Sequence, residues 1–76
     1  MKELLMYIVK HLVDNPDEVS IVERKLDAST IYELRVASGD MGKVIGRHGR
    51  TAKDIRTLIR AAAARRGERA TVEIMD

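Results

Sequence analysis

Apolar and polar positions recur along this 76-residue chain with two different periods, and the changes of period mark six elements. In residues 2–13 the apolar positions are spaced three and four apart, which predicts an amphipathic helix. Asn15 and Pro16 are expected to end this helix, because the residue before a proline is disfavoured in the helical conformation. Asp14, Asp17 and Glu18 cluster beside this proline, ahead of the next element, and we interpret these acidic residues as a solvated turn.

The next two elements are predicted to be strands that form a hairpin. Residues 19–26 are rich in β-branched side chains, which favour strands. Tyr32, Leu34 and Val36 alternate with polar residues, as in a strand with one covered face. Small and polar residues in the segment 27–30 predict the turn between the two strands.

The second half of the chain predicts a short helix, a long helix and a closing strand. Residues 38–40 offer an N-cap and an acidic first turn for a short helix that Gly46 stops. A long helix is expected over residues 50–66, with Gly67 placed as its C-terminal cap, and residues 69–74 alternate as a strand. The apolar stripe of the long helix consists of Ala52, Ile55, Leu58, Ile59, Ala62 and Ala63.

Composition narrows the functions that a domain of this size can have. The chain has no cysteine, which removes disulfides, zinc fingers and thiol nucleophiles. No nucleophile, base and orienting group can be assembled, and no second histidine lies at metal spacing from His11. We therefore expect no enzyme activity, no cofactor and no metal site. The apolar N-terminal run is short and has no cleavage site after it, so we expect no membrane span and a cytoplasmic location.

Charge is distributed unevenly along the chain. Residues 42–66 carry eight basic side chains and one acidic one, a net charge of +7. Residues 1–41 have a net charge of −3 and residues 67–76 of −2. A cationic segment on an otherwise acidic chain favours a polyanionic partner. With no Phe or Trp and two Tyr, stacking of bases on an aromatic platform is not expected to drive the binding.

The segment Gly46-Arg47-His48-Gly49 lies between the two predicted helices, inside the cationic region. Paired glycines permit a tight turn and the close approach of another backbone. The turn leads into the N-terminus of the long helix, whose unpaired N–H groups attract phosphate oxygens. Arg47, Arg50 and Lys53 add positive charge around that point, and Lys43 lies one helical turn before it. Each of these basic residues, taken alone, fits an ordinary solvated surface equally well.

The residues around the loop resemble the KH domain motif. G-x-x-G alone is weak evidence, but residues 43–55 also carry aliphatic side chains before the loop and again three and six positions after it. In KH domains such a loop joins two helices and clamps the backbone of about four nucleotides. The similarity covers residues 31–75, and a helix and a strand precede this core, as in the type II arrangement of bacterial KH domains. Nearly the whole chain resembles the KhpA family of small single-domain bacterial KH proteins, most specifically in residues 42–46 and 56–63.

The resemblance implies an α+β fold for residues 1–76, with the order α-β-β-α-α-β and a three-stranded sheet backed by three helices. It also implies binding of single-stranded RNA, and partnership as a homodimer or as a heterodimer with a larger KH-domain protein. Gly46 and Gly49 would shape the loop, while Arg47 and His48 would face the sugar-phosphate backbone. The residues carried over to RNA contact are Lys43, Ile45, Gly46, Arg47, His48, Gly49, Arg50 and Lys53.

Bases would lie in an aliphatic groove with walls from both helices and from residues 31–36. The candidate walls on the helix side are Val44, Ile45, Ala52 and Ile55. Val44, Ile55 and Leu58 at helical spacing are more typical of plain core, so Ile45 is the groove residue that we predict. Ala52 stands where the family often has a larger aliphatic residue, which would make the groove shallower.

A different class of function is also consistent with the sequence. The chain could be a protein-interaction subunit that docks a larger partner, with RNA binding secondary, for example through the alanines of residues 61–64. Small side chains permit close helix approach, although alanine is also the best helix former. Salt dependence separates the two hypotheses, because affinity for RNA falls steeply with salt and an apolar protein interface does not.

Overall fold

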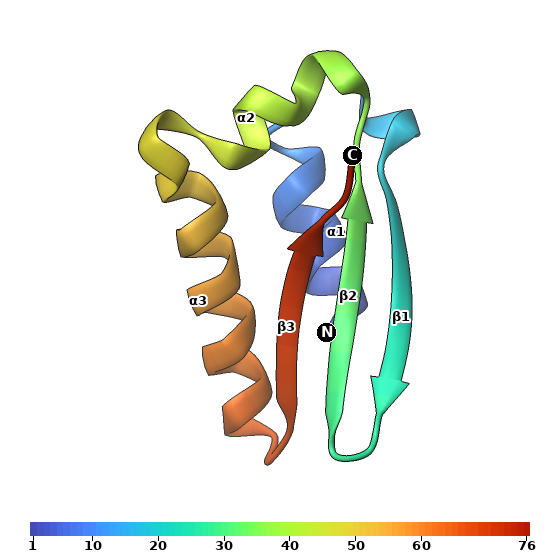
Figure 1. Cartoon of the computed structure of the whole chain (residues 1–76), viewed down its shortest axis with the longest axis vertical. Helices are drawn as coiled ribbons and strands as arrows, with labels where there is room; N and C mark the ends of the chain where they lie inside the picture. The colour runs from blue at the N-terminus through green and yellow to red at the C-terminus, as the bar shows by residue number, and fades with distance from the viewer.

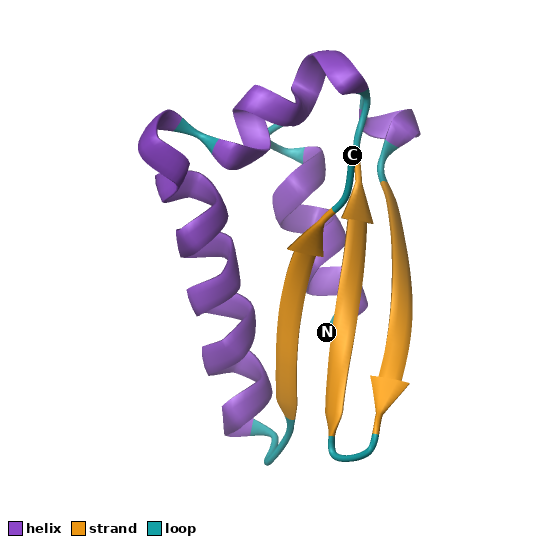
Figure 2. Ribbon diagram, in the orientation of Figure 1, coloured by secondary structure: helices purple, strands orange, loops and turns teal.

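Three helices cover one face of a three-stranded sheet in the computed structural model, which describes all of residues 1–76 (Figures 1 and 2). The predicted α+β class and the order α-β-β-α-α-β are confirmed. Three short 3-10 turns lie between these elements. In chain order the elements are α1 (Lys2–Lys10), η1 (Pro16–Glu18), β1 (Ser20–Leu26), β2 (Ser29–Arg35), η2 (Ser38–Asp40), α2 (Met41–Ile45), η3 (Arg47–Gly49), α3 (Arg50–Arg65) and β3 (Arg69–Ile74).

The sheet has the strand order β1-β2-β3 and mixes two kinds of pairing. β1 and β2 form the predicted antiparallel hairpin, whose turn contains Asp27 at a positive φ of 50°. β2 and β3 pair in parallel, with Tyr32 opposite Val72 and Leu34 opposite Ile74. Parallel neighbours need a long crossover, and here it consists of α2, η3 and α3. The glycine loop therefore lies on the crossover, beyond the carboxyl ends of β2 and β3 (Figure 1).

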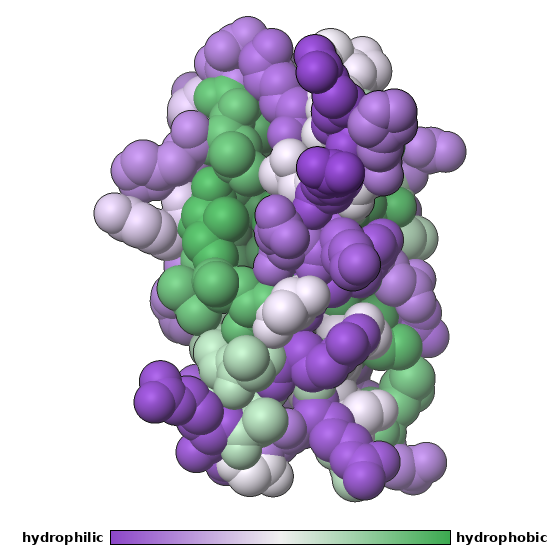
Figure 3. All heavy atoms as spheres, turned by 90° about the vertical axis from the view of Figure 1, so that its left-hand side faces the viewer, coloured by the Kyte–Doolittle hydropathy of each residue, from purple (hydrophilic) through white to green (hydrophobic).

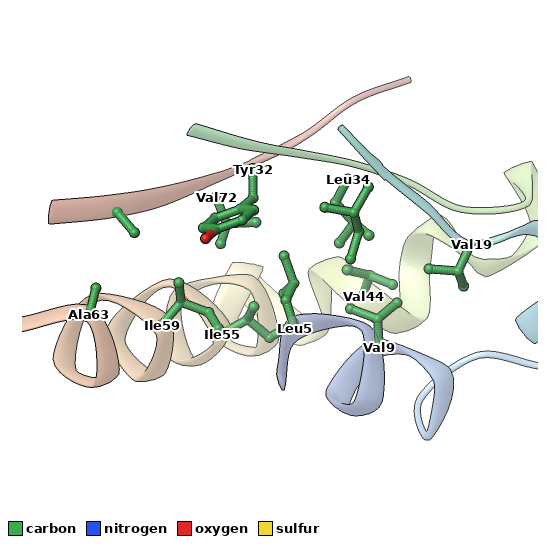
Figure 4. Close-up of a cluster of buried hydrophobic side chains, with 12 residues drawn as sticks. Leu5, Val9, Val19, Tyr32, Leu34, Val44, Ile55, Ile59, Ala63 and Val72 are labelled. Atoms are coloured by element: carbon green, nitrogen blue, oxygen red, sulfur yellow. The ribbon is translucent and has the colours of Figure 1, made fainter. Parts of the chain in front are cut away.

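The core lies between the sheet and the helices (Figure 4). Alternate residues of the strands point toward the helices, so that Tyr32, Leu34 and Val72 are buried. α3 presents one row of side chains to them, and Leu5 and Val9 of α1 complete the packing. The buried row on α3 consists of Ala52, Ile55, Ile59 and Ala63.

α1 is shorter than the predicted helix over residues 2–13, because it ends at Lys10. The N–H groups of His11 and Leu12 donate to carbonyls three residues earlier, which tightens the last turn. The chain then turns away, since the backbone N–H groups of Asp14 and Asn15 are bound by Asp40. A tertiary contact thus holds the segment that follows the helix, ahead of Pro16.

The C-terminal end of α3 agrees with the prediction for Gly67. This glycine has a φ of 71° and donates its N–H to the Ala64 carbonyl at 3.0 Å. The N–H of Glu68 reaches back to the Ala63 carbonyl at 2.9 Å. These two bonds define a Schellman motif, which reverses the chain and directs it into β3.

Two predictions about the surface of α3 are wrong. Leu58 was placed in the core stripe, yet 51% of it is exposed. Residues 61–64 do not form one alanine face, because Ala63 is buried whereas Ala61 and Ala64 are exposed. Successive residues turn by about 100° around a helix, so only the row through Ile55 and Ile59 reaches the sheet.

Candidate nucleic-acid interface

α2 positions the loop and is itself held by one core residue. Val44 is fully buried between the sheet and α1, which confirms that it is a core residue (Figure 4). The next residue, Ile45, is 39% exposed and lies at the surface, as a groove residue would. The N–H of Gly46 donates to the Gly42 carbonyl at 2.9 Å and ends the helix.

Gly46 has a backbone conformation that only glycine adopts readily, with φ 76° and ψ 175°. A Cβ placed here would lie 2.1 Å from Oγ1 and 2.9 Å from the backbone N of Thr51. The start of α3 therefore packs directly against the end of α2. This close approach requires glycine for both conformation and space.

The remainder of the loop is open to solvent. His48 and Gly49 have positive φ values of 58° and 74°, and the Gly49 N–H closes the turn on the Gly46 carbonyl at 3.2 Å. A Cβ at Gly49 would meet no atom within 4 Å. The outer surface of the loop is therefore free to contact another molecule closely.

Four of the predicted contact residues surround this loop with their side chains in solvent. None of them makes a hydrogen bond or an ion pair within the chain. They extend from η3 into the first turn of α3, where the positive end of the helix dipole adds to their charge. These residues are Arg47, His48, Arg50 and Lys53.

Lys43 differs from the other basic residues of the predicted site because it has an internal partner. Its Nζ lies 3.4 Å from Oδ2 of Asp14, on the segment that follows α1. Both side chains are largely exposed, and ion pairs of this kind are weak in water. Asp14 was interpreted as part of a solvated acidic turn, and its contact with Lys43 was not predicted.

Asp40 is the only buried charged residue, with 1% of its surface exposed. It directly precedes α2, but neither η2 nor α2 has a side-chain capping hydrogen bond, so the N-cap predicted within residues 38–40 is wrong. The Asp40 carboxylate instead accepts hydrogen bonds from the N–H groups of Asp14 and Asn15, at 3.2 and 3.0 Å, and from the Asn15 side-chain amide at 3.2 Å. Burial raises the pKa of the Asp40 carboxyl, but these donors, together with Lys43, outweigh burial and hold the pKa below its ordinary value.

The predicted aliphatic groove loses three of its four candidate walls on the helix side. Val44, Ala52 and Ile55 are 0%, 5% and 4% exposed and belong to the core, so Ile45 is the candidate there that stays at the surface. On the strand side Tyr32 and Leu34 are buried as well. Sequence periodicity could not separate a groove wall from a core position, because both are apolar and share one helix face.

Arg56 was missed by the sequence analysis. Its Nε donates to the Val72 carbonyl at 3.2 Å, on the edge of β3 that no strand covers. The bond holds the half-buried guanidinium between α3 and that strand edge. One signal pointed to it, since Arg56 directly follows Ile55 and therefore lies beside the row that faces the sheet.

The hollows of the surface lie away from the loop. One, of about 440 Å³, is at the opposite end of the molecule, between the β1–β2 turn and the residues that join α3 to β3. The other, of about 430 Å³, lies against α1. Neither hollow is lined by a residue of the loop. No cluster of three or more potential metal ligands occurs, and none of the helices has the length and hydrophobicity needed to cross a bilayer.

Comparisons with known proteins agree with this geometry. The family model described as "KhpA/KhpB, KH domain" matches residues 2–74. A protein of Chlamydia trachomatis named RNA-binding protein KhpA is 53% identical over 100% of this chain and 97% of its own length. Proteins of the same name from Clostridium acetobutylicum and Borreliella burgdorferi are 56% and 51% identical, over 99% and 97% of this chain and 100% and 90% of their own. No solved structure gave a significant match. The chain therefore belongs to the KhpA/KhpB family of KH domains.

Proposed function

We propose that this chain binds single-stranded RNA in the cytoplasm by clamping its sugar-phosphate backbone with the loop Gly46-Arg47-His48-Gly49. The observation that carries the proposal is the set of exposed basic side chains without internal partners around an open glycine turn. Relatives that match the full length of the chain are named RNA-binding protein KhpA. The chain acts as a binding module and not as an enzyme.

In the proposed complex, phosphate oxygens lie against the loop and the first turn of α3. Gly49 lets the RNA backbone come close, and Arg47, Arg50 and Lys53 neutralise phosphates around it. One base covers the exposed part of Ile45. Three phosphate contacts would make log Kd depend on log salt with a slope of magnitude roughly 2, because single strands release about 0.7 counterion per contact.

The test is fluorescence anisotropy with a short mixed-sequence single-stranded RNA. The variant Arg47→Asp, His48→Asp should lose most of the binding and keep its fold by circular dichroism, because aspartate tolerates the left-handed conformation of residue 48. The control Lys25→Glu, Arg69→Glu changes the net charge at least as much and lies at the opposite end of the molecule. If both variants bind like the native chain, or if the native chain does not bind, the proposal is wrong.

We also propose that the chain works in pairs, either with a second copy or with a larger KH-domain protein. A single backbone clamp binds weakly, and a second one raises the effective concentration at the RNA. α1 packs against α3, and the face that carries α3 shows a band of hydrophobic side chains (Figure 3). Leu58 of α3 and Leu4 of α1 are 51% and 36% exposed, and exposed apolar side chains on these two helices are the expected surface for pairing.

Sedimentation at micromolar concentration tests the pairing. Leu58→Asp should convert dimers to monomers, whereas Val22→Asp on β1, where the native residue is equally exposed, should leave the dimer intact. A native chain that is strictly monomeric contradicts the homodimer.

The remaining hypothesis is a protein-docking subunit in which RNA binding is secondary. It predicts that partner binding is insensitive to salt and survives the loop substitutions.

A further inference from the structure

Of the basic residues in the proposed RNA site, Lys43 alone is paired inside the free protein. Its partner, Asp14, comes from the segment between α1 and η1, far away in the sequence. Arg47, Arg50 and Lys53 have no acidic neighbour of this kind. The site therefore contains one cation whose charge is already partly neutralised by the protein itself.

The buried carboxylate of Asp40 fixes the position of Asp14. It binds the backbone N–H groups of Asp14 and Asn15, and α2 begins at the residue that follows it. The main chain of residue 14 is thus attached to the start of the helix that carries Lys43. Most surface ion pairs join two independently mobile side chains, whereas here the backbone of one partner is anchored beside the helix of the other.

We propose that Asp14 is an internal competitor of RNA phosphate at Lys43, an inference that rests on the proposed RNA binding. A phosphate that approaches the Lys43 ammonium must take the place of the Asp14 carboxylate or lie beside it, and either costs electrostatic energy. Asp14 thereby lowers the affinity for RNA and makes the contact at Lys43 conditional on a well-placed phosphate. Its removal leaves the other contacts of the loop unchanged.

A double-mutant cycle measured by anisotropy with the same short RNA tests the competition. Asp14→Asn should tighten binding about two- to fivefold, the range expected for the loss of one exposed ion pair. The salt slope should grow by up to about 0.7, because Lys43 without Asp14 can neutralise one phosphate fully. In a Lys43→Gln background, Asp14→Asn should have little effect.

Asp17→Asn is the matched control, because it removes the same charge from a nearby exposed residue that has no partner. The fold should survive Asp14→Asn, since the bond to Asp40 comes from the backbone. The competition is refuted if Asp14→Asn and Asp17→Asn have equal effects, or if the gain persists without Lys43. Failure of the RNA-binding proposal is seen separately, in a native chain that binds no better than the Arg47→Asp, His48→Asp variant.

Discussion

The two ends of α2 use their polar groups in opposite ways. At its start, Asp40 is buried and its carboxylate accepts hydrogen bonds from three internal donors. At its end, Gly46 leads into a loop whose basic side chains have no internal partner. A helix of five residues has no stability of its own and depends on tertiary anchors. The anchored end fixes the helix, and the other end leaves its donors free in solvent.

The largest effect is expected at the loop end, from Gly46→Ala. The new Cβ would overlap Thr51 and force alanine into a conformation that is almost confined to glycine. The free energy of unfolding should fall by roughly 2–4 kcal/mol in urea titrations. Gly49→Ala is the control, with open space around the Cβ, and should cost about 1–2 kcal/mol. Equal losses for the two variants would contradict the close packing at Gly46.

At the anchored end, Asp40→Ala should lower the melting temperature by several degrees. The N–H groups of Asp14 and Asn15 lose their acceptor, and the segment after α1 is no longer tied to α2. The loss should be smaller than for Gly46→Ala, because water can reach the freed N–H groups. Thermal unfolding followed by circular dichroism measures the melting temperature of each variant. Asp17→Ala, which removes an exposed carboxylate, should leave the melting temperature unchanged.

A dependence of stability on pH is expected at the anchored end. The native pKa of Asp40 lies below its ordinary value of 3.8, so its contribution to stability is complete above about pH 4. That contribution disappears as the pH falls through the native pKa, where the carboxylate is protonated and loses its donors. In urea titrations, the free energy of unfolding should fall less between pH 7 and pH 3 in Asp40→Asn than in the native chain. An equal fall in both proteins would show that Asp40 is not the group responsible.

The smallest effect on stability is expected from the free cations of the loop end. Arg50→Gln and Lys53→Gln should each change the free energy of unfolding by less than about 0.5 kcal/mol, because neither side chain has a partner in the protein. Each should nevertheless weaken RNA binding by about two- to fivefold and reduce the salt slope by about 0.7. A clear loss of stability would mean that these residues serve the fold as well as the ligand.

The order of elements was predictable because it depends on local periodicity and on residues that end helices. Gly67 shows this, since a glycine after a basic last turn needs no tertiary contact to act as a cap. The contact of Asp40 with the segment after α1 was not predictable, because it joins residues from distant parts of the chain. The exposure of Leu58 was also missed, since the apolar stripe of a helix does not show which of its residues will face the sheet in the folded chain.

The candidate site also has a part that the sequence predicted and a part that only the fold creates. The pattern of glycines and basic residues located the loop, and the structure brings Arg47, His48, Arg50 and Lys53 together around it. The pairing of Lys43 with Asp14 was not foreseen, because it joins residues that only the tertiary fold makes neighbours. Arg56 was missed for the same reason, since its partner is a backbone carbonyl of β3.

Local patterns of residues set where the helices and strands lie, where the loop falls and which segment carries positive charge, because these properties depend on residues close together along the chain. Which of those charges are free follows only from the folded chain. Hydrogen bonds and ion pairs depend on distances of a few ångströms between residues from separate elements. Packing sets such distances, and so Lys43 is held by Asp14 while Arg47 projects into solvent.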